Sequence, residues 1–402
     1  MPALSIQNVR KKFGNKVTAL DDVSLDVDSG EFFVLLGPSG SGKTTLIRCV
    51  AGLETVDSGK IIIGDRVVTD FPPGERNVAM VFQNYALYPF LSVYDNLSFP
   101  LRARGRLSKQ LKAQSSEGTA QSTSKLSSML GYGPVNRQTL KKDIDDRVHT
   151  VAKMLQINDL LDRKPGEISG GQRQRVALGR ALIRDASIYL MDEPLSNLDA
   201  KLRSSTRVEL KNLQKTLGIT IVYVTHDQIE AMTMGDRIGV INKGKLIQMG
   251  EPHDVYNLPE DLFVASFLGD PPINIIEAKV SQDDASSIEF GGYKLTIPGK
   301  PSLTSFRGSK LKMGVRPEDV LISDVGASAV VRLVRSIGRT NYVSMALTET
   351  QESVTKVTTE EVNLKDDQTV KVLPNISTLD IFESETQKLV WSSKKNSHSA
   401  KS

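Results

Sequence analysis

The chain has 402 residues, of which 39% are hydrophobic and 24% are charged, and its formal net charge is +4. This composition suffices for two or three domains with hydrophobic cores and excludes a wholly disordered protein. No apolar run approaches the roughly 18–20 residues that span a bilayer, the N-terminus lacks a signal-peptide pattern, and the single cysteine, Cys49, excludes an internal disulfide. We therefore expect a soluble, cytoplasmic protein.

The excess of basic residues is local. Between Arg102 and Lys142 the sequence contains nine basic residues and one acidic residue, Glu117. The remainder of the chain is therefore slightly acidic. A protein that binds nucleic acid usually has a basic domain or a basic face. Here the basic residues are concentrated in one segment and the rest of the chain is slightly acidic, so we expect no nucleic-acid partner.

Strand-like and turn-like stretches alternate in the first hundred residues. The pattern predicts strands at 6–13, 23–27 and 31–36, followed by a helix at 43–51 that ends at Gly52.

The pattern becomes helical after Pro89 and is interrupted by residues 108–136. This segment is rich in Ser, Gln, Thr and Lys, so we expect a mobile insertion. Its basic character suits contact with anionic lipid headgroups, and a solvated loop without a role is the alternative.

Two buried strands are expected at 187–191 and 220–225, with a helix between them. They follow helical periodicity at 144–155 and 172–183. Strands that alternate with helices predict a mostly parallel sheet covered on both faces.

The sequence changes character beyond Pro271 and Pro272. Short alternating strands at 293–297, 330–334 and 342–347 are separated by Gly, Pro and Ser, which is typical of a small all-β domain.

These patterns divide the chain into four parts. We expect an α/β domain at 1–240 with a helical subdomain at about 88–180, a connecting segment at 241–270, a β-rich domain at 271–391, and a flexible tail at 392–402.

A complete Gly-x4-Gly-Lys-Ser/Thr motif lies between the predicted strand at 31–36 and the helix at 43–51. Its glycines let the backbone N–H groups surround phosphates, so we expect an ATP site. Lys43 would reach the β- and γ-phosphates, and the Thr44 hydroxyl would hold Mg²⁺; a glycine-rich turn is the alternative. The residues expected to bind ATP here are Gly37, Pro38, Ser39, Gly40, Ser41, Gly42, Lys43, Thr44 and Thr45.

Two carboxylates follow the predicted strand at 187–191. Asp192 is expected to hold Mg²⁺, usually through water, and Glu193 to polarise the attacking water. Taken alone, the two acids could instead cap the next helix.

Residues 168–172, Ile-Ser-Gly-Gly-Gln, resemble the signature motif of ATP-binding-cassette (ABC) ATPases, with isoleucine in place of the usual leucine. The resemblance implies an α/β P-loop NTPase core with a helical subdomain. In this family the signature begins a helix and completes the ATP site of a partner subunit, so a head-to-tail homodimer, or a heterodimer with a similar cassette, is implied. The residues that take this role are Ser169, Gly170, Gly171 and Gln172.

Four more positions match the family. Gln83 resembles the glutamine that touches Mg²⁺ and water, and His226 resembles the switch histidine that contacts the γ-phosphate. Asp199 matches the loop that crosses the dimer interface, and Phe13 lies where an aromatic ring stacks on adenine. The structural alternatives are a surface glutamine, a strand-end histidine, a helix cap and a core phenylalanine. The resemblance thus implies Glu193, His226 and Gln83 as catalytic residues, and Thr44, Gln83 and Asp192 as metal ligands.

The resemblance extends beyond the ATPase core. Residues 244–256 and 263–274 look like the end of an importer cassette, and residues 313–319 resemble the small OB-like regulatory β-domain of sugar importers. The Pro-Pro-Ile-Asn element at 271–274 is similar to the junction in importers of oligosaccharides and glycerol-3-phosphate. Importers of polyamines, sulfate or ferric ions are alternatives, as are a soluble cassette ATPase that acts on ribosomes or DNA and a mainly regulatory protein.

Such a subunit implies particular partners. The resemblance implies two separate membrane permease subunits, an indirect solute-binding partner, and a peripheral position on the cytoplasmic face of the membrane. Residues 85–90 are rich in aromatics, and our hypothesis is that they line a groove for a short permease helix. Packing in the core of the helical subdomain is the alternative.

Overall fold

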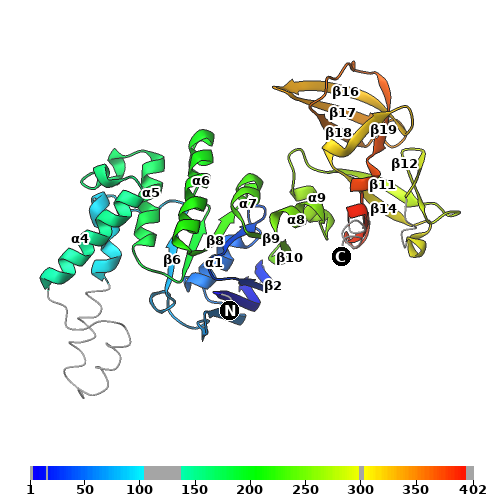
Figure 1. Cartoon of the computed structure of the whole chain (residues 1–402). Helices are drawn as coiled ribbons and strands as arrows, with labels where there is room; N and C mark the ends of the chain where they lie inside the picture. The colour runs from blue at the N-terminus through cyan, green and yellow to red at the C-terminus, as the bar shows by residue number, and fades with distance from the viewer. Residues whose placement is uncertain (1–2, 15–16, 104–136, 298–302, 395–402) are drawn as a thin grey trace. The chain divides into compact units, whose positions relative to one another are not determined.

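The computed structural model describes residues 3–14, 17–103, 137–297 and 303–394 (Figure 1). The insertion expected at 108–136 lies outside the described residues. The chain divides into two compact units: Met1–Arg237 with Ile241–Leu246, and Ile238–Val240 with Ile247–Ser402. Within the described ranges, no helix has both the length and the apolar character that a membrane crossing needs.

A six-stranded sheet has the order β10-β9-β3-β8-β7-β6, and its strands β3, β8, β7 and β6 belong to the first unit. The neighbouring strands β3, β8, β7 and β6 are parallel to one another. Every residue of β3, β7 and β8 is buried, which explains why these strands are nearly continuous apolar runs without alternation. The strands are β3 Phe32–Leu36, β6 Val78–Val81, β7 Ile188–Asp192, β8 Thr220–Thr225, β9 Arg237–Asn242 and β10 Lys245–Gly250.

Glycines end two of the helices in this unit. The helix α1 ends at Gly52, and α6 ends at Gly218, with φ angles of 75° and 62°. These left-handed conformations favour glycine at a helix end. The predicted helix at 43–51 and its end at Gly52 are therefore confirmed. The helices are α1 Lys43–Ala51, α4 Arg137–Met154, α5 Gly170–Leu182, α6 Ala200–Leu217 and α7 Gln228–Met234, and residues 93–103 are also helical.

A second sheet of the first unit has the strand order β2-β1-β4-β5 and is antiparallel. The long strands β1 and β2 contain the predicted strands at 6–13 and 23–27. The bounds are β1 Leu4–Phe13, β2 Val17–Val27, β4 Ser58–Ile63 and β5 Arg66–Val67.

The second unit is mainly β-structure, drawn in yellow to red in Figure 1. One sheet has the order β13-β12-β11-β14-β20-β21, and the other has the order β15-β19-β16-β17-β18. Aliphatic residues from both sheets form one hydrophobic core, as alternating strands predict. The strands are β11 Asn274–Val280, β12 Ser287–Phe290, β13 Tyr293–Thr296, β14 Lys310–Val315, β15 Val320–Ser323, β16 Ala327–Ile337, β17 Thr340–Leu347, β18 Ser353–Thr358, β19 Thr369–Pro374, β20 Asp380–Glu383 and β21 Leu389–Ser392.

The helices α8 (Pro252–Asn257) and α9 (Leu262–Phe267) belong to the second unit. Buried Arg316 holds them: its guanidinium donates to the carbonyls of Tyr256, Ala265 and Leu268. Most of the segment that we expected to be a connection is therefore packed with the β-domain.

The β-domain also extends further towards the C-terminus than expected. Ser392, where we expected the flexible tail to begin, is the last residue of β21 and is buried. Its hydroxyl donates to Asp380 Oδ1 at 2.6 Å, and Lys394 Nζ lies 3.8 Å from Asp380 Oδ2. These contacts show that Ser392 is part of the β-domain.

Candidate functional site

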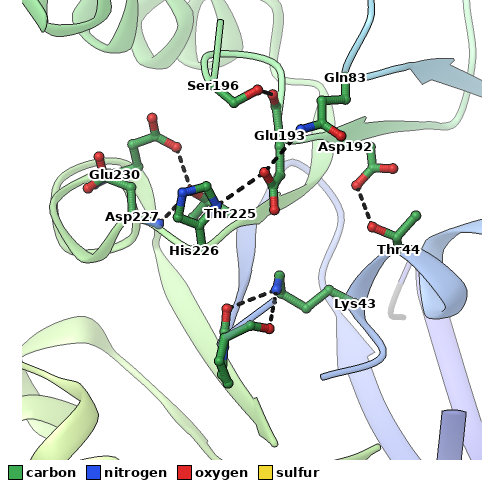
Figure 2. Close-up of polar contacts among 12 residues, drawn as sticks. Lys43, Thr44, Gln83, Asp192, Glu193, Ser196, Thr225, His226, Asp227 and Glu230 are labelled. Atoms are coloured by element: carbon green, nitrogen blue, oxygen red, sulfur yellow. Dashed lines mark hydrogen bonds and ion pairs between the residues drawn. The ribbon is translucent and has the colours of Figure 1, made fainter. Parts of the chain in front are cut away.

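The candidate site forms where the parallel strands β3, β8, β7 and β6 end. Because carboxyl ends of neighbouring parallel strands meet at one edge of a sheet, the loops that follow them converge there. The glycine-rich loop follows β3, His226 follows β8, Glu193 follows β7, and Gln83 lies in the turn after β6. Figure 2 shows the side chains of His226 and Gln83 pointing towards that of Glu193.

The loop at 37–42 needs glycine at particular positions. Gly40 and Gly42 have φ angles of 77° and 106°, in the left-handed region that side chains rarely adopt. A Cβ atom at Gly42 would lie 2.4 Å from the Ala19 carbonyl oxygen, and one at Gly37 would lie 2.2 Å from that of Ile241. The loop is therefore closely surrounded by backbone, and it leads directly into the N-terminus of α1.

Polar groups of this loop suit an anionic ligand. The Lys43 ammonium donates to the carbonyls of Gly37 and Pro38, both at 2.8 Å, and burial lowers the pKa of this lysine. Ser41 is buried, and its Oγ has no hydrogen-bond partner among the described residues. An unpartnered buried hydroxyl is costly, so the loop fits a ligand with several oxygen acceptors, such as a phosphate. Ser39 and the half-buried Thr45 flank these groups.

Thr44 and Asp192 form a hydroxyl–carboxylate pair that suits Mg²⁺. Thr44 Oγ1 donates to Asp192 Oδ1 at 3.0 Å. Burial raises the pKa of Asp192, and the Thr44 hydrogen bond opposes that shift. Oxygen ligands of this kind are those Mg²⁺ prefers, and it usually keeps several waters as well. Among the described residues, no group of three or more His, Cys, Asp or Glu side chains lies in positions that could hold a metal ion.

Glu193 lies at the centre of the polar cluster (Figure 2). Its Oε2 is 3.1 Å from His226 Nδ1 and accepts a hydrogen bond of 3.4 Å from Gln83 Nε2. Its backbone has φ of 43°, an uncommon value for a residue with a side chain. The arrangement can hold and deprotonate a water molecule beside the carboxylate.

Sequence reasoning missed two residues that support this cluster. Asn197 Nδ2 donates to the Gln83 carbonyl at 3.0 Å. Arg203 Nη1 lies 3.5 Å from Asp227 Oδ2, and its Nη2 donates to the carbonyls of Ser196 and Leu198. The guanidinium thus joins the loop after Glu193 to the turn after His226. A single arginine within a helix gives no sequence signal for such a role.

The signature residues lie at the start of α5. Ser169 caps this helix: its Oγ accepts from Gln172 N at 3.3 Å, while Gln172 Oε1 accepts from Ser169 N at 2.9 Å. A Cβ atom at Gly171 would lie 2.6 Å from Leu202 Cδ2, so glycine permits close packing of α5 against α6, and Gly170 is half-buried beside it. Among the described contacts, none joins Ser169 to the phosphate loop of the same chain.

Two predicted residues lie apart from the Glu193 cluster. Asp199 is exposed and caps α6, its Oδ1 accepting from Leu202 N at 3.0 Å. Phe13 ends β1 with 44% of its surface exposed, and the Lys11 ammonium lies 5.1 Å from the centre of its ring. The exposed ring of Phe13 can therefore stack on a base. Within the single chain Asp199 is a helix cap, as the structural alternative predicted.

Comparison with known proteins identifies the family. Residues 20–196 match the ABC transporter family, and residues 269–320 match the MalK OB fold domain. The chain is 44% identical, over 86% of its length and 88% of the relative's, to the trehalose/maltose import ATP-binding protein MalK of Thermococcus litoralis. The chain belongs to the family of ABC transporter ATP-binding subunits.

Other relatives agree with this assignment. An sn-glycerol-3-phosphate import ATP-binding protein UgpC of Brucella abortus is 42% identical over 89% of this chain and 91% of the relative. The structure of CbiO1 from Clostridium perfringens, part of an ABC transporter complex, aligns with 63% of this chain and 90% of its own at 25% identity, with a TM-score of 0.51. The predicted family, the cassette fold followed by an OB-like domain, and ATPase activity are thereby confirmed.

Proposed function

We propose that residues 37–45 bind the phosphates of ATP, with the Lys43 ammonium released from its loop carbonyls to face phosphate oxygens. The buried Ser41 hydroxyl, which has no partner among the described residues, supports this role, as do the left-handed conformations of Gly40 and Gly42 at the N-terminus of α1. The exposed ring of Phe13 would stack on adenine.

Thr44, Asp192 and Gln83 would hold Mg²⁺, the last two partly through water. Bound Mg²⁺ neutralises charge on the phosphate oxygens. The hydrogen bond between Thr44 Oγ1 and Asp192 Oδ1 supports the pairing, because the two groups already lie within reach of one ion.

Glu193 would take the proton of the attacking water. The observation that carries this proposal is the position of its carboxylate between His226 Nδ1 and Gln83 Nε2, at 3.1 and 3.4 Å. His226, which is about half exposed, would orient the water and contact the γ-phosphate. No covalent intermediate is needed, since positioning and charge stabilisation suffice for phosphoryl transfer to water.

Ser169, Gly170, Gly171 and Gln172 would complete the ATP site of a second copy or of a similar cassette. The signature residues are at the N-terminus of α5, where backbone N–H groups favour an anion, and they do not contact the phosphate loop of their own chain in the described contacts. Asp199 would lie at the same interface.

Mixed dimers test this arrangement. In a Glu193→Gln background, Ser169→Arg should bind ATP as a monomer but form no ATP-dependent dimer, whereas Lys43→Ala should lose ATP binding. Mixing the two double variants should produce dimers that retain one nucleotide each, because one composite site is then intact. Failure of the mixture to dimerise, or loss of ATP binding by the Ser169→Arg monomer, would place Ser169 in its own site.

The transport role follows from the relatives. We infer that this subunit drives two membrane permease subunits of a binding-protein-dependent importer, at the cytoplasmic face, and that its substrate is an oligosaccharide or glycerol-3-phosphate. The relatives named above import trehalose and maltose or glycerol-3-phosphate, and the MalK-type OB fold domain at 269–320 accompanies the cassette here.

The aromatic segment after Gln83 is the candidate permease contact. Tyr85 is buried, as the core alternative requires, but Tyr88 and Phe90 are 41% and 88% exposed. The centre of the Tyr88 ring lies 4.6 Å from that of Phe99, which is also exposed, and the Arg180 guanidinium lies 5.5 Å from the centre of the Tyr88 ring and donates to the Tyr85 carbonyl. Exposed aromatic rings grouped in this way make good interface anchors, so we assign the docking role to Tyr88 and Phe90.

A further inference from the structure

The first unit contains an apolar cavity that is separate from the residues proposed to bind ATP. It has a volume of about 350 Å³ and lies among α5, α6, the end of α4, and the ends of β6 and β7. The helices α4, α5 and α6 and the strand β6 are labelled in Figure 1. Its walls are mainly apolar: Val81, Met154, Leu178, Met191, Leu210 and Leu213 contribute side chains. A cavity of about 150 Å³ lined by such residues binds benzene, so this one has room for a two-ring molecule.

One polar atom in this apolar lining has no partner. Gln174, on α5, is 4% exposed, and its Oε1 accepts no hydrogen bond from any described residue. A buried carbonyl oxygen without a donor is unfavourable, and native proteins usually satisfy such atoms. An occupant with a single N–H or O–H donor would satisfy it.

The charged groups at the cavity are already neutralised. Arg175 Nη2 donates to both carboxylate oxygens of Glu209, at 3.0 and 2.8 Å, and Arg175 Nη1 donates to the Leu155 carbonyl at 3.2 Å. Because the Arg175 guanidinium and the Glu209 carboxylate neutralise each other, neither is left as an unpaired charge that would attract an ion. The occupant is therefore expected to be neutral.

We propose that this cavity binds a small neutral molecule with an apolar body of one or two rings and one hydrogen-bond donor, which faces Gln174 Oε1. The walls of this cavity belong to elements that also carry residues of the proposed ATP site. One wall belongs to the helix that Ser169 begins, another to the helix that Asp199 begins, and Met191 directly precedes Asp192. An occupant would contact all three elements without touching the phosphate loop. The inference does not depend on the transported substrate.

Indole and benzothiophene provide a matched pair of probes, since they have similar shape and only indole carries an N–H donor. The full chain is labelled with ¹³C at its methionine methyl groups, and the resonances of Met154 and Met191 are assigned with Leu substitutions. Of these two cavity residues, Met191 is 1% exposed, so its methyl group reports the interior. Indole should shift both resonances in a saturable titration, and benzothiophene should bind about 2- to 12-fold more weakly, the value of one net hydrogen bond.

Two variants separate the cavity from nonspecific binding. Gln174→Met removes the acceptor at nearly constant volume and should abolish the difference between the two probes. Leu213→Trp fills the cavity from α6 and should abolish both titrations; should that variant not fold, Gln174→Met still decides. If neither probe shifts the resonances of Met154 and Met191 at concentrations up to its solubility limit, the proposal is overturned, because the cavity would then hold water only. An indole preference that persists in Gln174→Met would overturn it too.

Discussion

Arg316 is predicted to be the main polar anchor of the second unit. Its buried guanidinium donates to Tyr256 O at 2.8 Å and Ala265 O at 3.2 Å, contacts Leu268 O, and lies 4.0 Å from the centre of the Tyr256 ring. Arg316→Met would leave three carbonyls without this donor, at about 1–3 kcal/mol each, while removing the cost of a buried charge. We expect a net loss of about 3–5 kcal/mol of unfolding free energy, or roughly 6–20 °C in the midpoint of this unit.

The single tryptophan makes the measurement selective. Trp391 lies in β21 of the second unit, so its fluorescence during heating follows that unit, while ATP binding reports the first. Arg332→Met is the matched control: Arg332 is half exposed, its ion pair with Asp367 spans 3.7 Å, and its loss should cost at most about 1 kcal/mol. If the unfolding midpoint of Arg316→Met differs from that of the wild type by no more than the midpoint of Arg332→Met does, the anchoring role is refuted.

Three further outcomes are expected. Glu193→Gln should retain ATP binding and lose about 10²- to 10⁴-fold in turnover, the usual contribution of a general base, with an ATP-stabilised dimer visible by size-exclusion chromatography; near-normal turnover would remove Glu193 from that role. Tyr88→Glu should abolish transport in reconstituted vesicles and preserve basal hydrolysis by the isolated subunit, whereas a joint loss would indicate a core residue. Deletion of residues 108–136, which lie outside the described residues, should leave transport and membrane association unchanged if the segment is a solvated loop, and reduced association would favour contact with anionic lipid.

The phosphate loop and the parallel strands could be predicted because their signals are local. The loop motif fixes its chemistry within eight consecutive residues, and fully buried strands such as β8 appear as short apolar runs. The end of α1 at Gly52 was predictable for the same reason, since the left-handed residue follows the helix directly.

Contacts between distant residues could not be predicted in this way. The carbonyls that Arg316 binds are 48 to 60 residues away in sequence, and those bonds help to hold α8 and α9 against the β-domain. Gln174 follows the signature motif and looks like part of it, whereas its unpartnered oxygen is evident only once α6 is packed opposite. Ser392 lies in a Ser/Lys-rich stretch that is typical of a tail, and its place in β21 is evident only from its pairing with Asp380 of β20, to which its hydroxyl also donates.

The central claim is that this ATPase drives a membrane importer. The most direct measurement is to purify the tagged Glu193→Gln variant from its native membranes in the presence of ATP and to identify the proteins that accompany it. The account predicts two multi-spanning permease subunits in stoichiometric yield. Recovery of the variant alone from the soluble fraction, or together with ribosomes, would contradict the transport role while leaving the ATPase chemistry in place.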